Sequence, residues 1–278
     1  MLRKSLVTFA AIAAFAAPLS AAGGDIVVEG KLPIGRDAAR EMVSAITRPV
    51  DGQIARFHAP ICPSVVGMGD DLNRRAEVRL RQVAAAVGAR VDATDCQPNL
   101  IVFVSGDVRQ QFSYLKRQAR PWFVGLNRYQ MNQLEKSDGP VLAWSATQMR
   151  NADGEILRTE VNPLEPSGMK VRSTSFVKPV GKQVIDGSVV IIDREALDQR
   201  PLWQIADYIA MRALTPTLVP ESNTTPTVLR AFSLPAGEGP QTLTAADLAF
   251  LRSVYSHDGL MSAVAERPRL ASEMAKEG

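Results

Sequence analysis

Apolar residues recur along this chain at two spacings, one typical of amphipathic helices and one typical of buried strands. The clearest helical pattern covers residues 70–87, where apolar side chains return every three or four positions until Gly88. The arginines of this segment fall off its apolar face and are expected in water: Arg74, Arg75, Arg79 and Arg81. Similar spacing predicts helices over 36–47, 202–214 and 243–255, and two helices within 107–136 on either side of Arg120-Pro121.

Strands are predicted where the apolar residues run without a break. Residues 100–105 are almost wholly apolar, which indicates burial on both faces inside a sheet. Residues 188–193 are a second such run, which predicts the strand that leads into the helix over 202–214. Two more strands are predicted over 141–149 and 169–178, and residues 53–66 are expected to be extended, with interruptions at the prolines.

Together these elements predict an α+β fold, with a mixed sheet packed by a long helix and a central helix. Residues 23–278 are expected to form a single domain, because no change in composition marks a boundary between two. The domain should end in a charged helical tail at about 258–276 that is interrupted near Pro268 and either packs loosely or meets a partner.

The first 22 residues have the pattern of an export signal. Arg3 and Lys4 precede an apolar stretch of roughly 12 residues, which suits a signal core but is short for a membrane span. Small residues before position 23 predict cleavage after Ala22. The protein is therefore expected to be exported, to a bacterial periplasm or outside the cell, with no membrane span in the mature chain. An uncleaved N-terminal anchor is the alternative.

Charge and cysteine content narrow the function classes. The chain has 32 basic and 29 acidic residues, and loss of Arg3 and Lys4 would leave it close to neutral, which gives no reason to expect a nucleic-acid partner. In an oxidising compartment, Cys62 and Cys96 are expected to form a disulfide worth about 3–4 kcal/mol on the chain-entropy estimate. A redox or metal-binding pair is the alternative, although the chain has no C-x-x-C spacing.

The order strand, helix, short apolar turn and closing helix over 188–255 carries a more specific signal. Thr227-Val-Leu stands at the turn, and the last helix begins Leu243-Thr-Ala-Ala-Asp247 and ends Val254-Tyr255. In these features the segment resembles the catalytic half of zincin metallopeptidases, particularly the matrixin-like secreted ones. It is also similar to a group of exported proteobacterial proteins of unknown function with the same Leu-Thr-x-x-Asp ending.

The resemblance does not extend to the zinc chemistry. A zincin helix carries two histidines at i and i+4 that bind Zn²⁺, and a glutamate between them acts as the base. Aligned on that motif, Asp207 and Met211 replace the first two ligands, Tyr208 replaces the base and Thr217 replaces the third ligand. A carboxylate, a thioether and a hydroxyl are not a credible zinc site. The chain has two histidines, so three imidazole ligands cannot be assembled, and neither a metal nor a cofactor is expected.

The same helix also has an ordinary interpretation. Leu202, Ile205, Ala206, Ile209 and Ala213 form the apolar stripe of any core-facing helix, so an unrelated α+β domain is the alternative fold.

Other combinations of residues are weaker. Ser256-His257-Asp258 contains triad residue types, but adjacent residues do not face one another, and the segment is better interpreted as a helix exit before Gly259. His58 could lie at a pocket edge, although a lone histidine is usually structural. The three tryptophans could form a ligand shelf or serve as core anchors.

The resemblance implies a non-catalytic role. A zincin cleft binds extended peptide along the edge strand ahead of its central helix, here 141–149. Asp207, Tyr208 and Met211 would form the floor of that cleft. We therefore expect an exported pseudoenzyme that binds a peptide, a protein or an envelope component. The alternatives are a hydrolase that uses the cleft with non-zinc chemistry and a purely structural envelope protein.

Overall fold

The computed structural model describes residues 26, 28–30, 34–151, 154–156, 179, 181–221 and 226–276. The predicted signal segment 1–22 and the predicted strand 169–178 lie outside this part of the chain. The elements, in chain order, are α1 (Arg36–Ile46), β1 (Arg56–Phe57), β2 (Pro63–Val66), α2 (Asp70–Ala86), β3 (Leu100–Ser105), α3 (Val108–Gln118), η1 (Arg120–Phe123), α4 (Arg128–Lys136), β4 (Val141–Arg150), β5 (Lys182–Asp193), η2 (Glu195–Leu197), α5 (Leu202–Ala213), η3 (Val228–Arg230), α6 (Ala245–Tyr255) and α7 (Ala263–Met274).

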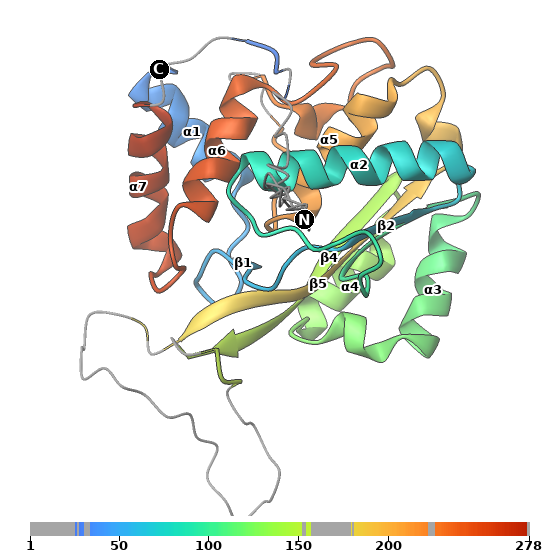
Figure 1. Cartoon of the computed structure of the whole chain (residues 1–278), viewed down its shortest axis with the longest axis horizontal. Coiled ribbons are helices and arrows are strands. Elements are labelled where there is room, and N and C mark those ends of the chain that lie inside the picture. Colours follow the sequence, from blue (N-terminus) through green and yellow to red (C-terminus); the bar gives the residue numbers. More distant parts are fainter. Residues whose placement is uncertain are drawn as a thin grey trace, which may run out of the picture.

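Within these residues, five strands form one mixed sheet that is organised around β5. β5 pairs in parallel with β1 and β3 and antiparallel with β4, while β2 pairs in parallel with β3. Helices α1, α2, α5, α6 and α7 lie on one side of the sheet, and α3 and α4 lie on the other (Figure 1). The predicted α+β architecture with a mixed sheet is therefore confirmed.

The two faces of the sheet pack into separate cores. The larger core joins Val102, Val190 and Ile192 to the helices of the first layer. The smaller core joins Trp144, Val189 and Ile191 to α3, η1 and α4. Along β3, burial alternates: Leu100, Val102 and Val104 are buried, whereas the residues between them are only half-buried. The prediction that β3 is buried on both faces is thus wrong for its second face.

β5 is longer than its apolar pattern indicates. The predicted strand 188–193 is only its second half, and the first half contains Gln183, Asp186 and Gly187, which break the apolar run. Gly187 is required because a Cβ there would lie 2.6 Å from the Trp122 ring. The register of β4 against β5 shifts beside this point, and Asp186 forms an ion pair with Arg150 at 2.7 Å.

The C-terminal helix differs from the prediction. α7 continues through Pro268, although an interior proline costs a helix about 3 kcal/mol. The cost is offset by tertiary packing, because Leu270, Ala271 and Met274 are buried and α7 packs against α1 and α6. The tail is therefore part of the core instead of being loosely attached.

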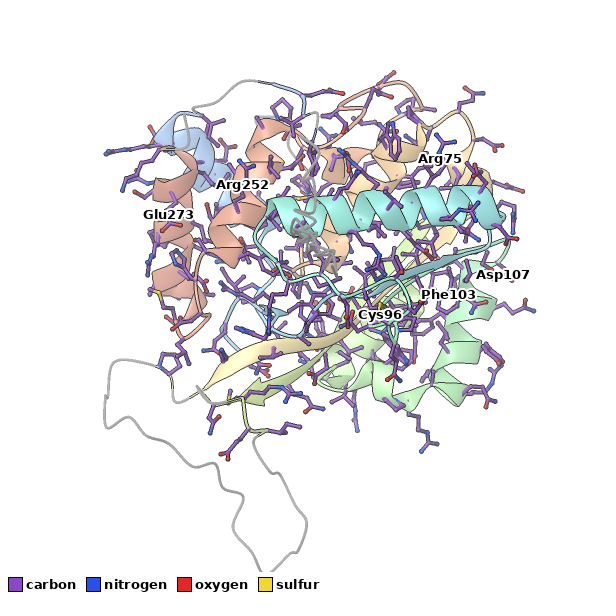
Figure 2. The ribbon with its side chains drawn as sticks, viewed as in Figure 1. Arg75, Cys96, Phe103, Asp107, Arg252 and Glu273 are labelled. Carbon is purple, nitrogen blue, oxygen red and sulfur yellow. A yellow bond between two sulfur atoms is a disulfide. The ribbon has the colours of Figure 1, made fainter. Side chains whose placement is uncertain are left out.

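Cys62 and Cys96 form the predicted disulfide. Cys62 precedes β2, and Cys96 lies in the loop between α2 and β3 (Figure 2). Their Cα atoms are 6.0 Å apart. The bond therefore closes the β2–α2–β3 crossover near the two strands that it connects. In the described part of the chain, every helix is too short or too polar to cross a membrane.

Candidate functional site

Helix α5 is enclosed on nearly all sides. It packs on β4 and β5 and against α2 (Figure 1). Ile205, Ile209 and Ala213 enter the main core, which accounts for the apolar stripe in the sequence. The polar residues of α5 are enclosed as well, because neighbouring elements cover the flanks of the helix.

Asp207 is fully buried and bound by four donors. Arg79 of α2 contacts both carboxylate oxygens, with Nε 2.7 Å from Oδ1 and Nη2 2.9 Å from Oδ2. Oδ2 also accepts hydrogen bonds from Thr242 Oγ1 at 2.5 Å and from the Leu243 backbone N–H at 2.8 Å. This bidentate geometry is the strong form of the arginine–carboxylate pair. The residue at the first zincin ligand position therefore joins α2, α5 and the start of the closing segment.

Arg79 departs from the sequence prediction. Its side chain is 9% exposed, although the helical pattern places it with the solvated arginines of α2. The guanidinium of Arg79 also lies 5.9 Å from the ring centre of Trp203. A buried arginine is rare without a partner, and here that partner lies 128 positions away in the sequence.

The other predicted site residues lie in three different surroundings. Tyr208 packs edge-on against Phe232 with ring centres 4.7 Å apart, and burial raises the pKa of its phenol. Met211 is fully buried in the main core. Thr217 donates a hydrogen bond to the Met211 carbonyl at 2.9 Å. Thr217 also lines a groove beside β4, and Asp207, Tyr208 and Met211 are not among the residues that line it.

The histidines are also held by internal contacts. Burial lowers the pKa of His58 to about 4, assisted by Lys182, whose Nζ lies 3.3 Å from Nδ1. Nε2 of His257 lies 2.8 Å from Glu273 Oε1 and 3.3 Å from Ser256 Oγ. Serine and glutamate meet the same nitrogen, so this arrangement cannot relay a proton as a triad does. Asp258 instead accepts a hydrogen bond from Leu260 N–H, as a helix exit requires.

The three tryptophans do not form a common shelf. Trp144 donates a hydrogen bond from its indole to the Trp122 carbonyl, and both belong to the smaller core. Trp203 is on the other side of the sheet, where it is 43% exposed beside Arg75 and Arg79. The interpretation as separate anchors therefore fits their positions.

Strand β4 has one edge beside α5 that no other strand of the described residues covers. Ala143 and Ser145 on this edge are 6% and 7% exposed, and the Thr147 N–H donates a hydrogen bond to the Val124 carbonyl. Ser188 of β5 donates its N–H to Asn99, on the β3 side. Ser145 lies opposite Ser188, and because the backbone groups of Ser188 point to the β3 side, the two residues form a non-hydrogen-bonded pair of the antiparallel ladder. The N–H and C=O of Ser145 therefore point away from β5. The same holds for Ala143, two positions earlier. Among the described residues no strand pairs with this edge, apart from a single bridge between Arg150 and Ile156.

A groove follows this edge, and we call it the β4 groove. One wall is formed by Arg48, Arg212 and Thr217, and the other by Leu126, Gln130 and Leu134. It consists of a cavity of about 260 Å³ beside Val141–Ala143 and a narrow inner cavity of about 30 Å³ beside Ser145. Both cavities are lined by Arg48 and Arg212, and Lys136 lines the larger one.

The β4 groove is strongly cationic. No aspartate or glutamate lines either of its cavities. Burial lowers the pKa of Arg48, and the positive charge of the nearby Arg212 lowers it further. Nε of Arg212 is buried and has no hydrogen-bond partner among the described residues. Two half-buried like charges are thus held together without a counter-charge.

Sequence reasoning missed both of these arginines. Arg48 precedes Pro49 and looks like part of a helix stop, and Arg212 looks like a solvated residue near a helix C-terminus. Only the fold brings the end of α1 and the end of α5 to the same edge of β4. The sequence signal that does point here is the predicted edge strand 141–149, which β4 confirms as a strand.

No group of three or more histidine, cysteine, aspartate or glutamate side chains in the described residues could hold a metal ion. No family model matches the chain, and neither a curated protein nor a solved structure matches it. The likeness to zincins therefore stays a prediction that rests on residues 188–255.

Proposed function

We propose that this protein is an exported, non-catalytic zincin-like binding module that takes up an extended peptide segment as an additional strand on β4. One observation carries the proposal: the backbone groups of Ala143 and Ser145 point into a groove beside α5. Strand addition of this kind derives affinity from main-chain hydrogen bonds and specificity from the side chains around them. Export rests on the signal pattern of residues 1–22.

The residues at the zincin positions support a role without peptidase chemistry. Both oxygens of Asp207 are occupied by internal donors, so this carboxylate is not available as a ligand or base. Tyr208 is buried against Phe232, and its raised pKa leaves even less phenolate near neutral pH to act as a base than in an ordinary tyrosine. Neither residue reaches the β4 groove.

Peptide binding is tested with a matched pair of variants at Ala143. Ala143→Pro removes the outward N–H at an edge position where proline is tolerated, whereas Ala143→Gly keeps that N–H. Peptides selected from a random library on the wild-type protein should lose at least tenfold in affinity for the proline variant and little for the glycine variant. Equal affinity for both variants would contradict strand addition, provided that both unfold cooperatively.

The absence of catalysis needs a separate test. The mature protein, purified and then incubated with and without added Zn²⁺, should not cleave casein or a pooled peptide substrate. Stoichiometric zinc in the purified protein, together with proteolysis that a chelator abolishes, would overturn the non-catalytic part of the proposal.

A further inference from the structure

The two walls of the β4 groove differ in chemistry. Side chains of β4 alternate between the two cores: Ala143 faces the α5 side, and Leu142 and Trp144 face the α4 side. The arginine wall lies on the α5 side, because Arg212 belongs to α5. Leu126 and Leu134 lie on the α4 side, where they pack with Trp144. A strand beside β4 would therefore meet positive charge on one face and apolar surface on the other.

The arginine wall lacks an anion. Each guanidinium carries five N–H donors in a fixed planar arrangement that matches a carboxylate. The side chains of Arg48 and Arg212 have no acidic partner among the described residues, and Arg212 Nε is buried without an acceptor. Such a pair of half-buried like charges is unfavourable, and a bound carboxylate would relieve the repulsion and supply the acceptor that Arg212 Nε lacks.

We propose that Arg48 and Arg212 together bind one carboxylate of the peptide, so that the ligand is an extended segment in which acidic and apolar residues alternate. This inference rests on the proposed strand addition at β4. Successive side chains of an added strand point to opposite faces, so a residue whose carboxylate reaches Arg48 and Arg212 has neighbours directed at Leu126 and Leu134. The inner cavity of about 30 Å³ has room for one or two water-sized groups, which suits a carboxylate and excludes a bulky side chain.

The carboxylate has two sources, an acidic side chain or the end of a chain. Three synthetic octapeptides distinguish them. The first alternates glutamate and valine and has both ends blocked. The second has glutamine in place of glutamate, also with both ends blocked. The third is the glutamine peptide with a free C-terminal carboxylate. Affinities are measured by fluorescence anisotropy at low salt, because exposed charge interactions are screened as salt rises.

Wild-type protein should bind the glutamate peptide at least tenfold more tightly than the blocked glutamine peptide. Arg48→Gln and Arg212→Gln should each lose that preference while binding the blocked glutamine peptide as the wild type does. Arg117→Gln, which removes an exposed cation of α3 that lies outside the groove, should keep the preference. If the glutamine peptide with the free end binds as tightly as the glutamate peptide, the carboxylate is that of a chain terminus.

Other outcomes separate this inference from the proposed function. Equal affinity for the glutamate and blocked glutamine peptides, with both lost in Ala143→Pro, would overturn the carboxylate site and leave strand addition intact. A preference for glutamate that survives in the double variant Arg48→Gln/Arg212→Gln would also overturn it. A third outcome would show an anion site without strand addition. In that case Ala143→Pro would bind the glutamate peptide as tightly as the wild type, and citrate would compete with the peptide equally in both proteins. No binding of any of the peptides would contradict both proposals.

Discussion

In the part of the chain that the structure describes, two arginines are buried, Arg56 and Arg79, and each is neutralised by a carboxylate from a distant part of the chain. Arg79 meets Asp207, and Arg56 meets Glu266 with both side chains essentially inaccessible to water. Arg56 also donates to the carbonyls of Ile54 and Val254. A buried ion pair gains little over an apolar pair of the same volume, but the loss of one partner leaves an uncompensated charge.

Breaking the Arg79–Asp207 pair should therefore be costly, and removing both charges should be less so. Asp207→Asn is expected to lower the free energy of unfolding by about 3–5 kcal/mol. The double variant Arg79→Met/Asp207→Leu should cost less than either single replacement, because no charge is left buried. Urea unfolding followed by circular dichroism measures Asp207→Asn, the double variant and its two single replacements, Arg79→Met and Asp207→Leu.

The exposed pair Arg74–Asp71 is the matched control on the same helix, with 68% and 72% of the side chains exposed. Arg74→Ala should cost less than 1 kcal/mol. A cost for Asp207→Asn as small as this control, or strict additivity of the two core replacements, would contradict the role assigned to the pair.

His58 should make the folded protein sensitive to mild acid. Burial is the main reason that its pKa is lowered to about 4, and the positive charges of Lys182, Arg56 and Arg90 contribute to the lowering. The carboxylate of Asp258 acts in the opposite direction. In the unfolded chain a histidine takes up its proton near pH 6.5. Between pH 6.5 and about 4 the unfolded state thus binds a proton that the folded state does not, so the stability present above pH 6.5 is lost as the pH falls.

The variant His58→Gln carries no titrating group at this position. The decrease in its free energy of unfolding between pH 7 and pH 5 should be smaller than in the wild type, measured by urea titrations at both values. Parallel losses in the two proteins would show that His58 does not contribute to acid sensitivity.

At the scale of elements, two helices begin with the same motif in different surroundings. α6 starts with a capping box between Thr244 and Asp247, and α4 starts with one between Asn127 and Gln130. Asp247 is fully buried and also accepts hydrogen bonds from Thr227 Oγ1 at 2.6 Å and Val228 N–H at 2.9 Å. The box of α6 therefore anchors η3 as well as its own helix.

This difference predicts unequal costs for the two caps. Asn127→Ala, at an exposed N-cap, should lower the free energy of unfolding by about 1 kcal/mol. Asp247→Ala should cost about 2–4 kcal/mol, because it leaves the buried N–H groups of Val228 and Thr244 without acceptors. Thermal and urea unfolding of the two variants side by side provide the comparison. Equal costs would mean that Asp247 does no more than cap α6.

Elements with a strong internal period were predictable from the sequence. α2, β3 and α5 end within one residue of their predicted limits, because their apolar faces repeat over several turns or fill a whole strand. The first half of β5 was not predicted, since it depends on pairing with partner strands and not on its own composition. Residues 56–57 lie within the segment 53–66 that the sequence predicts to be extended, but their pairing with β5 leaves no sign in their composition. The continuation of α7 through Pro268 likewise depends on packing against α1 and α6.

The candidate site was less predictable than the fold. The sequence predicted the strand beside the groove, and it placed Thr217 near the cleft in place of a third zincin ligand. It also placed Arg79 in solvent and gave no role to Arg48 and Arg212. Pairings between residues more than 100 positions apart leave no local pattern, and the sequence of a helix does not reveal which of its flanks a neighbouring helix will cover. Only the assembled layers supply that information.

At the scale of the whole molecule, the disulfide should contribute measurably to stability. Cys62 and Cys96 are 34 positions apart, and closing a loop of that length stabilises a fold by about 3–4 kcal/mol on the chain-entropy estimate. The double variant Cys62→Ser/Cys96→Ser should unfold at a correspondingly lower urea concentration than the oxidised wild type. The reduced wild type should behave like the variant. An unchanged midpoint in the reduced protein, with two free thiols confirmed by titration, would contradict this.

The central position of β5 also bears on the order in which the chain can fold. Within the described residues β5 is the last strand to be synthesised, and β1 and β4 have no other strand to pair with. During synthesis, the residues that precede β5 can form the β2–β3 pair but cannot complete the sheet, because long-range pairings must wait for both partners. For a chain that is exported as we propose, this late assembly would keep it in a form that can still be threaded across a membrane.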